Sequence, residues 1–433
     1  METNNQKNDQ NIIPNDADKQ QKGVNVPNLR FPNFNSIWQK NKFGNLLTLL
    51  KNNTLSRAEL NYENGKIKNI HYGDVLIKFN DFVLSNSKII PYINDDSIPH
   101  NYADLLLKTG DLIIADTAED YTVGKATELI FNDQSLIISG LHTIPCRPIN
   151  DIFGSKYLGY YINSPSFHNQ LLPLIQGIKV SSISKSQIVD TFISYPKINE
   201  QGKITEFLTL IDQLIDTQSK IIEDLDTLKN SIMDQLLMRD IFDEISIKDF
   251  INQGYARIIK ASEMKKFSGE KLYLSTSSID KNGIFKIECK ITYNDRPSRA
   301  SMIPIKNSVW FAKMKDSIKV YKSENDDESK YILSTGFYGI LCNEDVVNPD
   351  WMVEIFKSNY FNNQKDRFSE GSSMSGIKEN QLEDIKVKLF KNKNLEKKYC
   401  QLFYILNKKL NVETDYLEKL KEQKKYLLSN MFI

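Results

Sequence analysis

Three carboxylates stand close together in the first half of the chain and could bind a divalent cation. Asp116, Glu119 and Asp120 fall within five positions, and hard oxygen ligands of this kind suit Mg²⁺ or Ca²⁺. Carboxylates in such a cluster also cap turns, or accept a hydrogen bond from the amino group of cytosine. The turn, cap or base-contact roles are favoured, so no metal site is predicted.

A second group has the residue order of a metal-dependent nuclease. Asp280 is followed by Glu288 and Lys290, but this order is common by chance in a chain with 26% charged residues. The sequence contains neither a G-x-x-x-x-G-K-[ST] phosphate loop nor a G-x-G-x-x-G motif, which disfavours an ATP-driven motor. Residues 348–351 (NPDW) lack the second proline of an amino-methyltransferase tetrapeptide and predict a helix start. No catalytic residue is predicted.

The histidines and cysteines lack the spacing of metal ligands. They are His71, His100, His142, His168, Cys146, Cys289, Cys342 and Cys400. We expect the cysteines to be buried free thiols in a reducing cytoplasm. No stretch approaches the 18 consecutive apolar residues of a membrane span.

Basic and aromatic side chains alternate between positions 286 and 322. The basic ones are Lys286, Lys290, Arg296, Arg299, Lys306, Lys313, Lys315, Lys319 and Lys322, and the aromatic ones are Tyr293, Trp310, Phe311 and Tyr321. This pattern suits contact with phosphate groups, although a solvated strand face would look the same. Residues 243–433 carry more Lys and Arg than Asp and Glu, and residues 1–242 carry the reverse. A general basic coat for nucleic acid is therefore absent.

The sequence pattern of a long helix, which would position the globular regions that carry these residues, occurs twice. Apolar residues recur at alternating steps of four and three in two stretches offset by 195 positions, which predicts two long helices with a coiled-coil seam. The first seam contains Ile204, Leu208, Ile211, Ile215, Gln218, Ile222, Leu225, Lys229, Ile232 and Leu236; the second contains Tyr399, Phe403, Leu406, Leu410, Glu413, Leu417, Leu420, Lys424, Leu427 and Met431. Similar lead-ins, 177–188 and 371–382, precede them. The chain thus reads as two copies of one module.

The polar seam positions of the two copies coincide and suggest a register for an antiparallel pair. Gln218 corresponds to Glu413, and Lys229 corresponds to Lys424. A constant index sum of 642 would pair Lys229 with Glu413 and Gln218 with Lys424, satisfying both polar layers. The alternative is that these side chains reach solvent.

The regions before each seam are rich in short β-type runs and end in helices. In the first module the runs are 74–79, 112–115 and 136–146, and Ser164-Pro165 starts a helix through Leu174. In the second they are 284–293, 309–314, 318–322 and 331–342, with a helix through Phe356. The expected fold class is α+β: two globular domains separated by a pair of long antiparallel coiled-coil helices. The expected ranges are a disordered tail 1–26, globular domains 27–196 and 241–390, and spacer helices 197–240 and 391–433.

With these features the chain resembles the specificity subunit of type I restriction-modification systems. Residues 27–32 (PNLRFP) are similar to the entry of the family's first target recognition domain, and 200–204 (EQGKI) to the start of its central spacer helix. Residues 110–125 and 139–147 are similar to one recognition-domain subtype, and 296–300, 311–315 and 334–337 to another. Residues 394–398 (NLEKK) depart from the Glu-Gln form in the second copy.

The resemblance implies a non-catalytic DNA-reading subunit. Each recognition domain would bind one half of an asymmetric bipartite target on double-stranded DNA, and the spacer helices would set the gap and dock two methyltransferase subunits. S-adenosylmethionine, ATP and Mg²⁺ would be bound by the modification and restriction subunits. The implied DNA contacts are Tyr121, Thr122, Lys125, Arg296, Ser298, Arg299, Lys313, Lys315, Lys319 and Thr335. The rival interpretations are a lone nuclease using Asp280, Glu288 and Lys290, and a coiled-coil scaffold without a DNA role.

Overall fold

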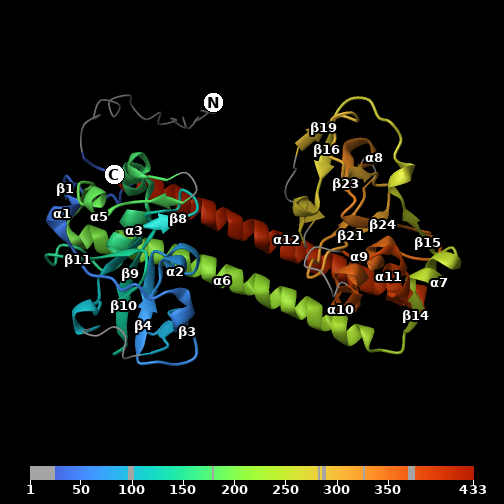
Figure 1. Cartoon of the computed structure of the whole chain (residues 1–433), viewed down its shortest axis with the longest axis horizontal. Helices are drawn as coiled ribbons and strands as arrows, with labels where there is room; N and C mark the ends of the chain where they lie inside the picture. The colour runs from blue at the N-terminus through green and yellow to red at the C-terminus, as the bar shows by residue number, and fades with distance from the viewer. Residues whose placement is uncertain are drawn as a thin grey trace, which may run out of the picture. The chain divides into compact units, whose positions relative to one another are not determined.

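The chain divides into two compact units, each of which takes part of its residues from the C-terminal region. The computed structural model describes residues 25–95, 102–177, 180–280, 283–284, 289–324, 327–368 and 376–433. Unit 1 comprises Met1–Ile215 and Lys419–Ile433, and unit 2 comprises Asp216–Glu418. Nearly all of the predicted tail lies outside the described residues. Figure 1 shows both units as mixtures of helices and strands, which confirms a mixed α/β fold.

Unit 1 contains a five-stranded and a four-stranded sheet. The first has the order β2 (Leu47–Leu49), β11 (Thr143–Pro148), β7 (Leu112–Ala115), β9 (Ala126–Ile130) and β5 (Phe82–Leu84). The second has the order β10 (Leu136–Ser139), β4 (Ile67–Ile70), β6 (Tyr92–Ile93) and β3 (Leu60–Asn61). Two-stranded pairs join β1 (Gln39–Lys42) to β13 (Phe192–Tyr195) and β8 (Thr117–Ala118) to β12 (Ser181–Ser182). The short helices are α1 (Phe43–Leu46), α2 (Tyr72–Ile77), α3 (Tyr157–Asn163), α4 (Pro165–Leu171) and α5 (Lys185–Ile188).

Unit 2 contains two four-stranded sheets. One has the order β15 (Ala256–Ile259), β24 (Phe337–Cys342), β21 (Ser308–Ala312) and β22 (Val320–Lys322). The other has the order β19 (Cys289–Ile291), β16 (Lys271–Leu274), β23 (Tyr331–Ser334) and β20 (Ala300–Met302). The pairs are β14 (Phe242–Ser246) with β25 (Lys386–Phe390) and β17 (Ile279–Asp280) with β18 (Gly283–Ile284). The helices are α7 (Ile247–Asn252), η6 (Thr276–Ser278), α8 (Asp327–Lys330), α9 (Pro349–Lys357), α10 (Asn359–Phe368) and α11 (Glu379–Asp384).

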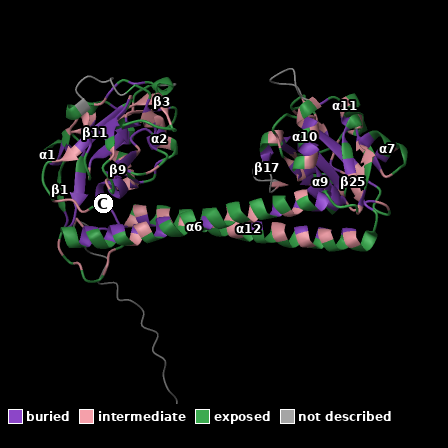
Figure 2. Ribbon diagram, turned by 90° about the horizontal axis from the view of Figure 1, so that it is seen from below, coloured by how far each residue is buried: buried purple, intermediate pink, exposed green. Residues whose placement is uncertain are grey.

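The two units use the same local plan. In unit 1, β11–β7–β9 are neighbours and β10 pairs with β4 in parallel; in unit 2, β24–β21–β22 are neighbours and β23 pairs with β16 in parallel. In each unit, the strands of both sheets carry buried apolar side chains. Figure 2 shows the buried residues gathered inside each unit. The repeat inferred from the sequence therefore extends to the strand pairing.

One predicted strand is wrong, because residues 74–79 lie mostly in helix α2. Val75, Ile77 and Phe79 alternate like a half-buried strand, but the His71 side chain accepts a hydrogen bond from Gly73 N and caps the helix. The predicted helix starts are confirmed: Pro165 and Pro349 each occupy the first turn, and Asn348 Oδ1 accepts from Asp350 N at 2.9 Å. Part of the predicted run 284–293 lies outside the described residues.

The long helices are present as α6 (Ile198–Leu237) and α12 (Lys393–Asn430). Every predicted seam position is buried or half-buried. In unit 1, Leu208 and Leu427 belong to one apolar cluster; in unit 2, Met233 and Phe403 belong to another. No described helix is long and apolar enough to cross a membrane.

The proposed seam register is wrong. Gln218 Nε2 donates to Glu413 Oε2 at 2.5 Å, which gives an index sum of 631 rather than 642. Lys229 bonds to Asn407 instead of Glu413, and Lys424 bonds to Asp212 instead of Gln218. These contacts give index sums of 631 and 636, which are 11 and 6 below the predicted sum. Sliding one helix by a heptad brings the same face to its partner. The apolar pattern could not distinguish the two registers.

Three of the four cysteines are buried free thiols, as expected. Cys146, Cys342 and Cys400 are buried, whereas Cys289 is exposed, contrary to the prediction. Burial raises the pKa of the Cys342 thiol to about 12.

Candidate functional site

In unit 1 three segments meet around the loop 116–125. Lys125 Nζ donates to the main-chain oxygen of Leu76 at 2.9 Å, which ties the loop to α2. Asp116 N donates to His142 O at 3.1 Å, which ties the loop to the turn between β10 and β11. His142 has a positive φ of 56° in that turn. The sequence-predicted residues Tyr121, Thr122 and Lys125 thus share one loop with two supporting segments.

Asp116 and Asp120 make local contacts within and beside this loop. Asp120 Oδ1 accepts from Thr122 N at 2.9 Å and from Thr122 Oγ1 at 2.5 Å, and the hydroxyl hydrogen bond lowers the pKa of Asp120. Asp116 Oδ1 lies 3.3 Å from His142 Nδ1. No group of three His, Cys, Asp or Glu side chains within the described ranges could hold a metal ion. Asp120 is therefore a turn residue, and the contact of these carboxylates with a base stays a prediction.

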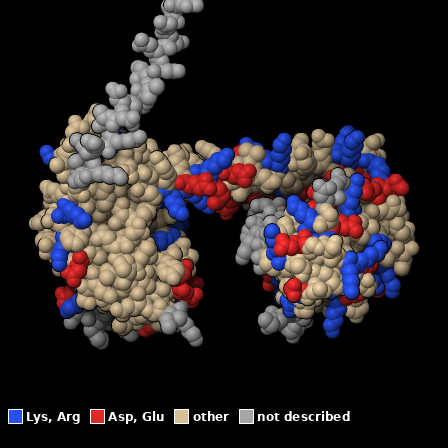
Figure 3. Space-filling model, turned by 90° about the horizontal axis from the view of Figure 1, so that it is seen from above, with Lys and Arg blue, Asp and Glu red and all other residues tan. Residues whose placement is uncertain are grey.

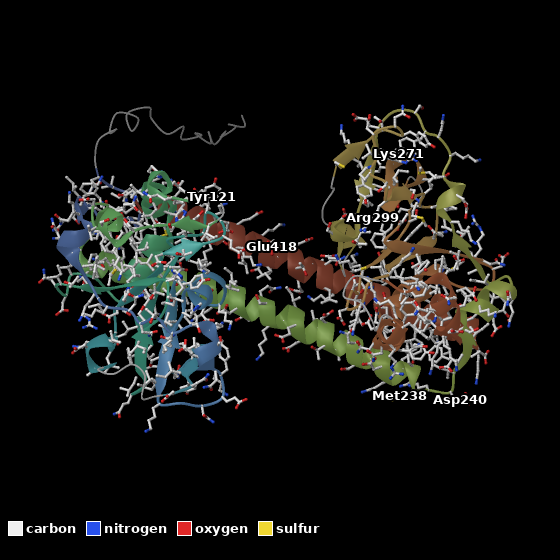
Figure 4. The ribbon with its side chains drawn as sticks, in the orientation of Figure 1. Tyr121, Met238, Asp240, Lys271, Arg299 and Glu418 are labelled. Atoms are coloured by element: carbon white, nitrogen blue, oxygen red, sulfur yellow. The ribbon has the colours of Figure 1, made fainter. Side chains whose placement is uncertain are left out.

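A pocket of about 670 Å³ opens beside the loop. It is lined by Asn80, Asp81, Tyr121, Thr122, Lys125, Asn163, His168, Lys424 and Lys425. Tyr121, labelled in Figure 4, lines the pocket and is 76% exposed. The His168 ring nitrogen Nε2 lies 3.1 Å from Tyr121 O. Burial lowers the pKa of Lys125, partly offset by the charge of Asp81. The pocket combines cationic and amide side chains with an exposed aromatic ring.

Unit 2 brings four of its seven predicted residues together by hydrogen bonds to main-chain oxygens. Thr335 N donates to Arg299 O at 2.8 Å, and Lys313 N donates to Gly336 O at 2.9 Å. Lys319 Nζ donates to Thr276 O at 2.5 Å. The loop between β21 and β22, the β23–β24 turn, η6 and the segment before β20 therefore form one cluster. Three of these segments have counterparts in unit 1, namely the loop 116–125, the turn between β10 and β11, and α2.

The predicted contact residues of unit 2 differ in exposure and in the partners of their side chains. Ser298, Arg299 and Lys315 are exposed, and Figure 4 shows Arg299 at the surface of unit 2. The Arg296 guanidinium stacks 4.1 Å from the Tyr293 ring centroid and also donates to Tyr293 O. Lys313 Nζ lies 4.0 Å from the Tyr338 centroid, and burial lowers its pKa.

The residues of the nuclease interpretation have other partners where they are described. Asp280 Oδ1 accepts from Gly283 N at 3.0 Å, and Lys290 Nζ pairs with Glu270 at 3.2 Å. Glu288 and Lys286 lie outside the described residues. On the face shown in Figure 3, unit 2 carries many Lys and Arg side chains whereas unit 1 is mostly uncharged.

Beneath each loop cluster lies a buried polar network that uses the seam lysine. In unit 1, Lys424 Nζ lies 2.6 Å from both Asp81 and Asp212, and Tyr160 Oη donates to Asp212 at 2.6 Å. The charges of Asp81 and Asp212 raise the pKa of Lys424 despite its burial.

In unit 2, Lys229 Nζ lies 2.9 Å from Glu354 and donates to Asn407 Oδ1 at 2.6 Å. Asn407 Nδ2 donates to Glu354 Oε1 at 2.8 Å. The polar seam residues are therefore satisfied inside their own units. The alternative that Lys229 reaches solvent is wrong, because its side chain is only 10% exposed.

The long helices also carry large apolar side chains that face solvent. On α6 and α12 these include Leu210, Leu214, Ile221, Leu228, Tyr404, Ile405, Val412 and Tyr416. Several recur at the seven-residue spacing of a helical stripe, separate from the buried seam.

Sequence reasoning missed part of both clusters. Ile77, at the end of α2, is 84% exposed, and Ser277 in η6 is also exposed. Because residues 74–79 were predicted as a strand, the exposed position of Ile77 at the end of α2 was not predicted. The signal that could have found it is His71, a capping side chain placed directly before the apolar run.

The chain is similar to proteins of bacterial and archaeal restriction systems. Residues 35–227 match the family model described as "Type I restriction modification DNA specificity domain". The "Putative type I restriction enzyme MjaX specificity subunit" of Methanocaldococcus jannaschii is 25% identical over 170 residues, which are 38% of this chain and 40% of that protein. The matched segment thus spans less than half the length of this curated relative.

Two solved structures share the fold over most of the chain. The type I restriction-modification S subunit from M. genitalium aligns with a TM-score of 0.53 and 15% identity, covering 94% of this chain and 99% of that one. A chain from a structure on "complex assembly and conformational transition of the type I R-M system" aligns with a TM-score of 0.54 and 12% identity, covering 91% and 97%. At these identities the likeness establishes the fold alone.

Proposed function

We propose, from the premise that residues 35–227 belong to the type I restriction modification DNA specificity domain family, that this chain is the DNA-reading subunit of a restriction-modification complex. The observation that carries the proposal is the duplicated loop cluster. Matching strands hold matching loops in both units, but the side chains on those loops differ. Two different readers on one scaffold suit a bipartite target whose halves differ.

The division of labour within the chain follows from this proposal. Residues 27–196 and 241–390 form the two target recognition domains, and 197–240 and 391–433 form an antiparallel coiled-coil spacer that sets the gap between half-sites. Tyr121, Thr122 and Lys125 lie in the contact region of the first domain. The contact region of the second comprises Arg296, Ser298, Arg299, Lys313, Lys315, Lys319 and Thr335.

Partner subunits would supply the chemistry. The exposed apolar residues of α6 and α12 suit burial against helices of two methyltransferase subunits, since solvent-facing apolar stripes mark protein interfaces. S-adenosylmethionine would be bound by those subunits, and ATP and Mg²⁺ by the restriction subunits. The chain itself would be non-catalytic.

The test is to express the chain with its methyltransferase partner and map methylated adenines in the host DNA. We expect one motif with two unlike halves. Arg299→Ala should relax the requirement of one half only, and Tyr121→Ala that of the other, while the exposed Lys248→Ala serves as the control. Each lost base contact should cost about 1 to 3 kcal/mol of discrimination.

Three results would overturn the proposal. They are Mg²⁺-dependent cleavage by the chain alone, sequence-independent binding by the assembled complex, and a single undivided motif. The first would favour the nuclease interpretation, and the second would favour the scaffold.

A further inference from the structure

Lys125 and Lys319 stand at equivalent places and use their side chains in the same way. Lys125 directly precedes β9, and Lys319 directly precedes β22. Each donates from Nζ to a main-chain oxygen of a short helix: Leu76 O in unit 1 at 2.9 Å and Thr276 O in unit 2 at 2.5 Å. Both ammonium groups thus hold a helix against the recognition loop.

The two short helices correspond as well. Helix α2 follows β4, which pairs in parallel with β10, and η6 follows β16, which pairs in parallel with β23. Each begins with a side chain that accepts from the amide two residues on, His71 from Gly73 and Ser275 from Ser277. The helices are therefore fixed by a cap at one point and by a lysine at another.

The residue after each lysine-bonded carbonyl projects from the surface. In unit 1 this residue is Ile77, which is 84% exposed beside a loop whose Tyr121 is 76% exposed. In unit 2 it is Ser277, which is also exposed. A rigidly held isoleucine in water gains free energy when an apolar partner covers it, whereas Ser277 is polar and its hydroxyl lies 2.6 Å from Ser275 Oγ.

We propose that Ile77 determines specificity by contacting the C5-methyl group of a thymine in the major groove of the half-site read by unit 1. Ser277 occupies the corresponding position in unit 2 and faces a polar base edge. The inference rests on the proposed function. The thymine methyl is the apolar group that base pairs present in the major groove, and Ile77 is the apolar side chain at the tip of the cluster. Lys125 is a positioning residue that acts through Ile77.

The test removes the methyl group and the side chain separately. In the assembled methyltransferase complex, each thymine of the mapped half-site is replaced in turn by deoxyuridine, and DNA affinity is measured. A half-site that contains the methylated adenine contains at least one thymine, on the opposite strand. For the unaltered protein we expect one position to cost about fourfold in affinity, the value of one buried methyl.

Ile77→Ala should lower affinity by about tenfold and abolish the penalty of deoxyuridine at that one position. The matched control is Ile37→Ala, since Ile37 is also in unit 1 and is 67% exposed, but lies outside the loop cluster. It should leave both affinity and the deoxyuridine pattern unchanged.

Lys125→Gln separates positioning from phosphate contact. We expect it to weaken the thymine-methyl penalty while the slope of log affinity against log salt stays constant. A slope smaller by about one would mean that Lys125 binds a phosphate, and would overturn its positioning role.

The proposal fails if Ile77→Ala binds like the unaltered protein, or if it loses affinity while every deoxyuridine penalty remains. Loss of complex assembly in Ile77→Ala would also overturn it, by placing Ile77 at a protein interface. These outcomes differ from failure of the proposed function, in which the unaltered complex itself shows no sequence preference.

Discussion

Each unit buries a lysine in a polar network, and the two networks place the acidic partner on different elements. The seam lysine is Lys424 in unit 1 and Lys229 in unit 2. In each network one residue comes from the other long helix and one comes from a short helix. In unit 1 the long helix supplies the acid, Asp212, and α3 supplies Tyr160. In unit 2 the long helix supplies the amide Asn407, and α9 supplies the acid, Glu354.

This difference shows that the position of the network matters more than the identity of its members. Residues 160 and 354 are 194 positions apart, and 212 and 407 are 195 apart, so the same sites are used. Buried ions require partners wherever they can be found. Unit 1 adds Asp81, which has no counterpart among the described contacts of Lys229.

Lys424→Met should have the largest effect, because it leaves Asp81 and Asp212 facing each other without a cation. Removing one partner from a buried pair costs about 3 to 5 kcal/mol. Hydrogen exchange of the full chain should show lost protection in unit 1. Lys229→Met should affect unit 2 less, since only Glu354 loses its cation.

Lys425→Met is the control for this comparison, since Lys425 is the exposed neighbour on α12. Equal losses for Lys424→Met and Lys229→Met would contradict the role assigned to Asp81.

Moving the carboxylate of the Lys229 network from position 354 to position 407 should give the next largest effects on the stability of unit 2. Glu354→Gln leaves Lys229 without a carboxylate and should cost about 2 kcal/mol. Adding Asn407→Asp places the acid on the long helix, as in unit 1, and the amide introduced at position 354 can then donate to it. The double variant should recover at least about 1 kcal/mol, a coupling measurable by a double-mutant cycle.

A strictly additive cycle would show that the two sites do not interact through Lys229. The variant Asn407→Asp alone separates this result from a general gain of charge, because it should not stabilise unit 2 when Glu354 is present.

Much of this plan is readable from the sequence, because periodicity reports which face of an element is buried. The seam positions of α6 and α12 were identified correctly for that reason. Their register was not, since sliding one helix by a heptad presents the same buried face. Lys424 and Lys229 find their acids partly on other elements, Asp81 and Glu354, which no seam pattern contains. The register therefore depends on contacts with residues outside the seam.

The loop clusters were predictable only in part. Tyr121, Thr335 and Arg299 lie on loops, as predicted, and main-chain bonds to other segments bring their neighbours together. Ile77 escaped because a six-residue helix and a strand of alternating apolar residues look alike. Ser277 carries no distinguishing signal in the sequence.

A pH-dependent difference between the units should be smaller. Burial raises the pKa of Glu128 to about 7, against the effect of hydrogen bonds from Gly159 N and Lys156 N at the start of α3. Lys322 stands at the equivalent place in unit 2 and pairs with Asp350. Unit 1 therefore has a buried carboxyl at a place where unit 2 has none.

The native state of unit 1 then binds more protons than the unfolded state between the unfolded pKa, near 4.5, and about 7. The stability that Glu128 contributes is fully present below pH 4.5 and is lost as pH rises through 7, with a slope of about 1.4 kcal/mol per pH unit between these values. Glu128→Gln should remove this slope from unit 1, measured by hydrogen exchange at several pH values. An unchanged slope would assign it to another group.

The smallest effect on stability is expected at the contact between Gln218 and Glu413, which tests the register on which the comparison depends. Glu413 also pairs with Lys409, so replacing Gln218 leaves the carboxylate with a partner. Gln218→Cys combined with Glu413→Cys, with exposed Cys289 replaced by serine, should form a disulfide under mild oxidation. Lys229→Cys with Glu413→Cys should not, because 11 residues separate 218 from 229 and place them about 16 Å apart along the helix. The reverse result would restore the index sum of 642 and remove the equivalence of the two networks.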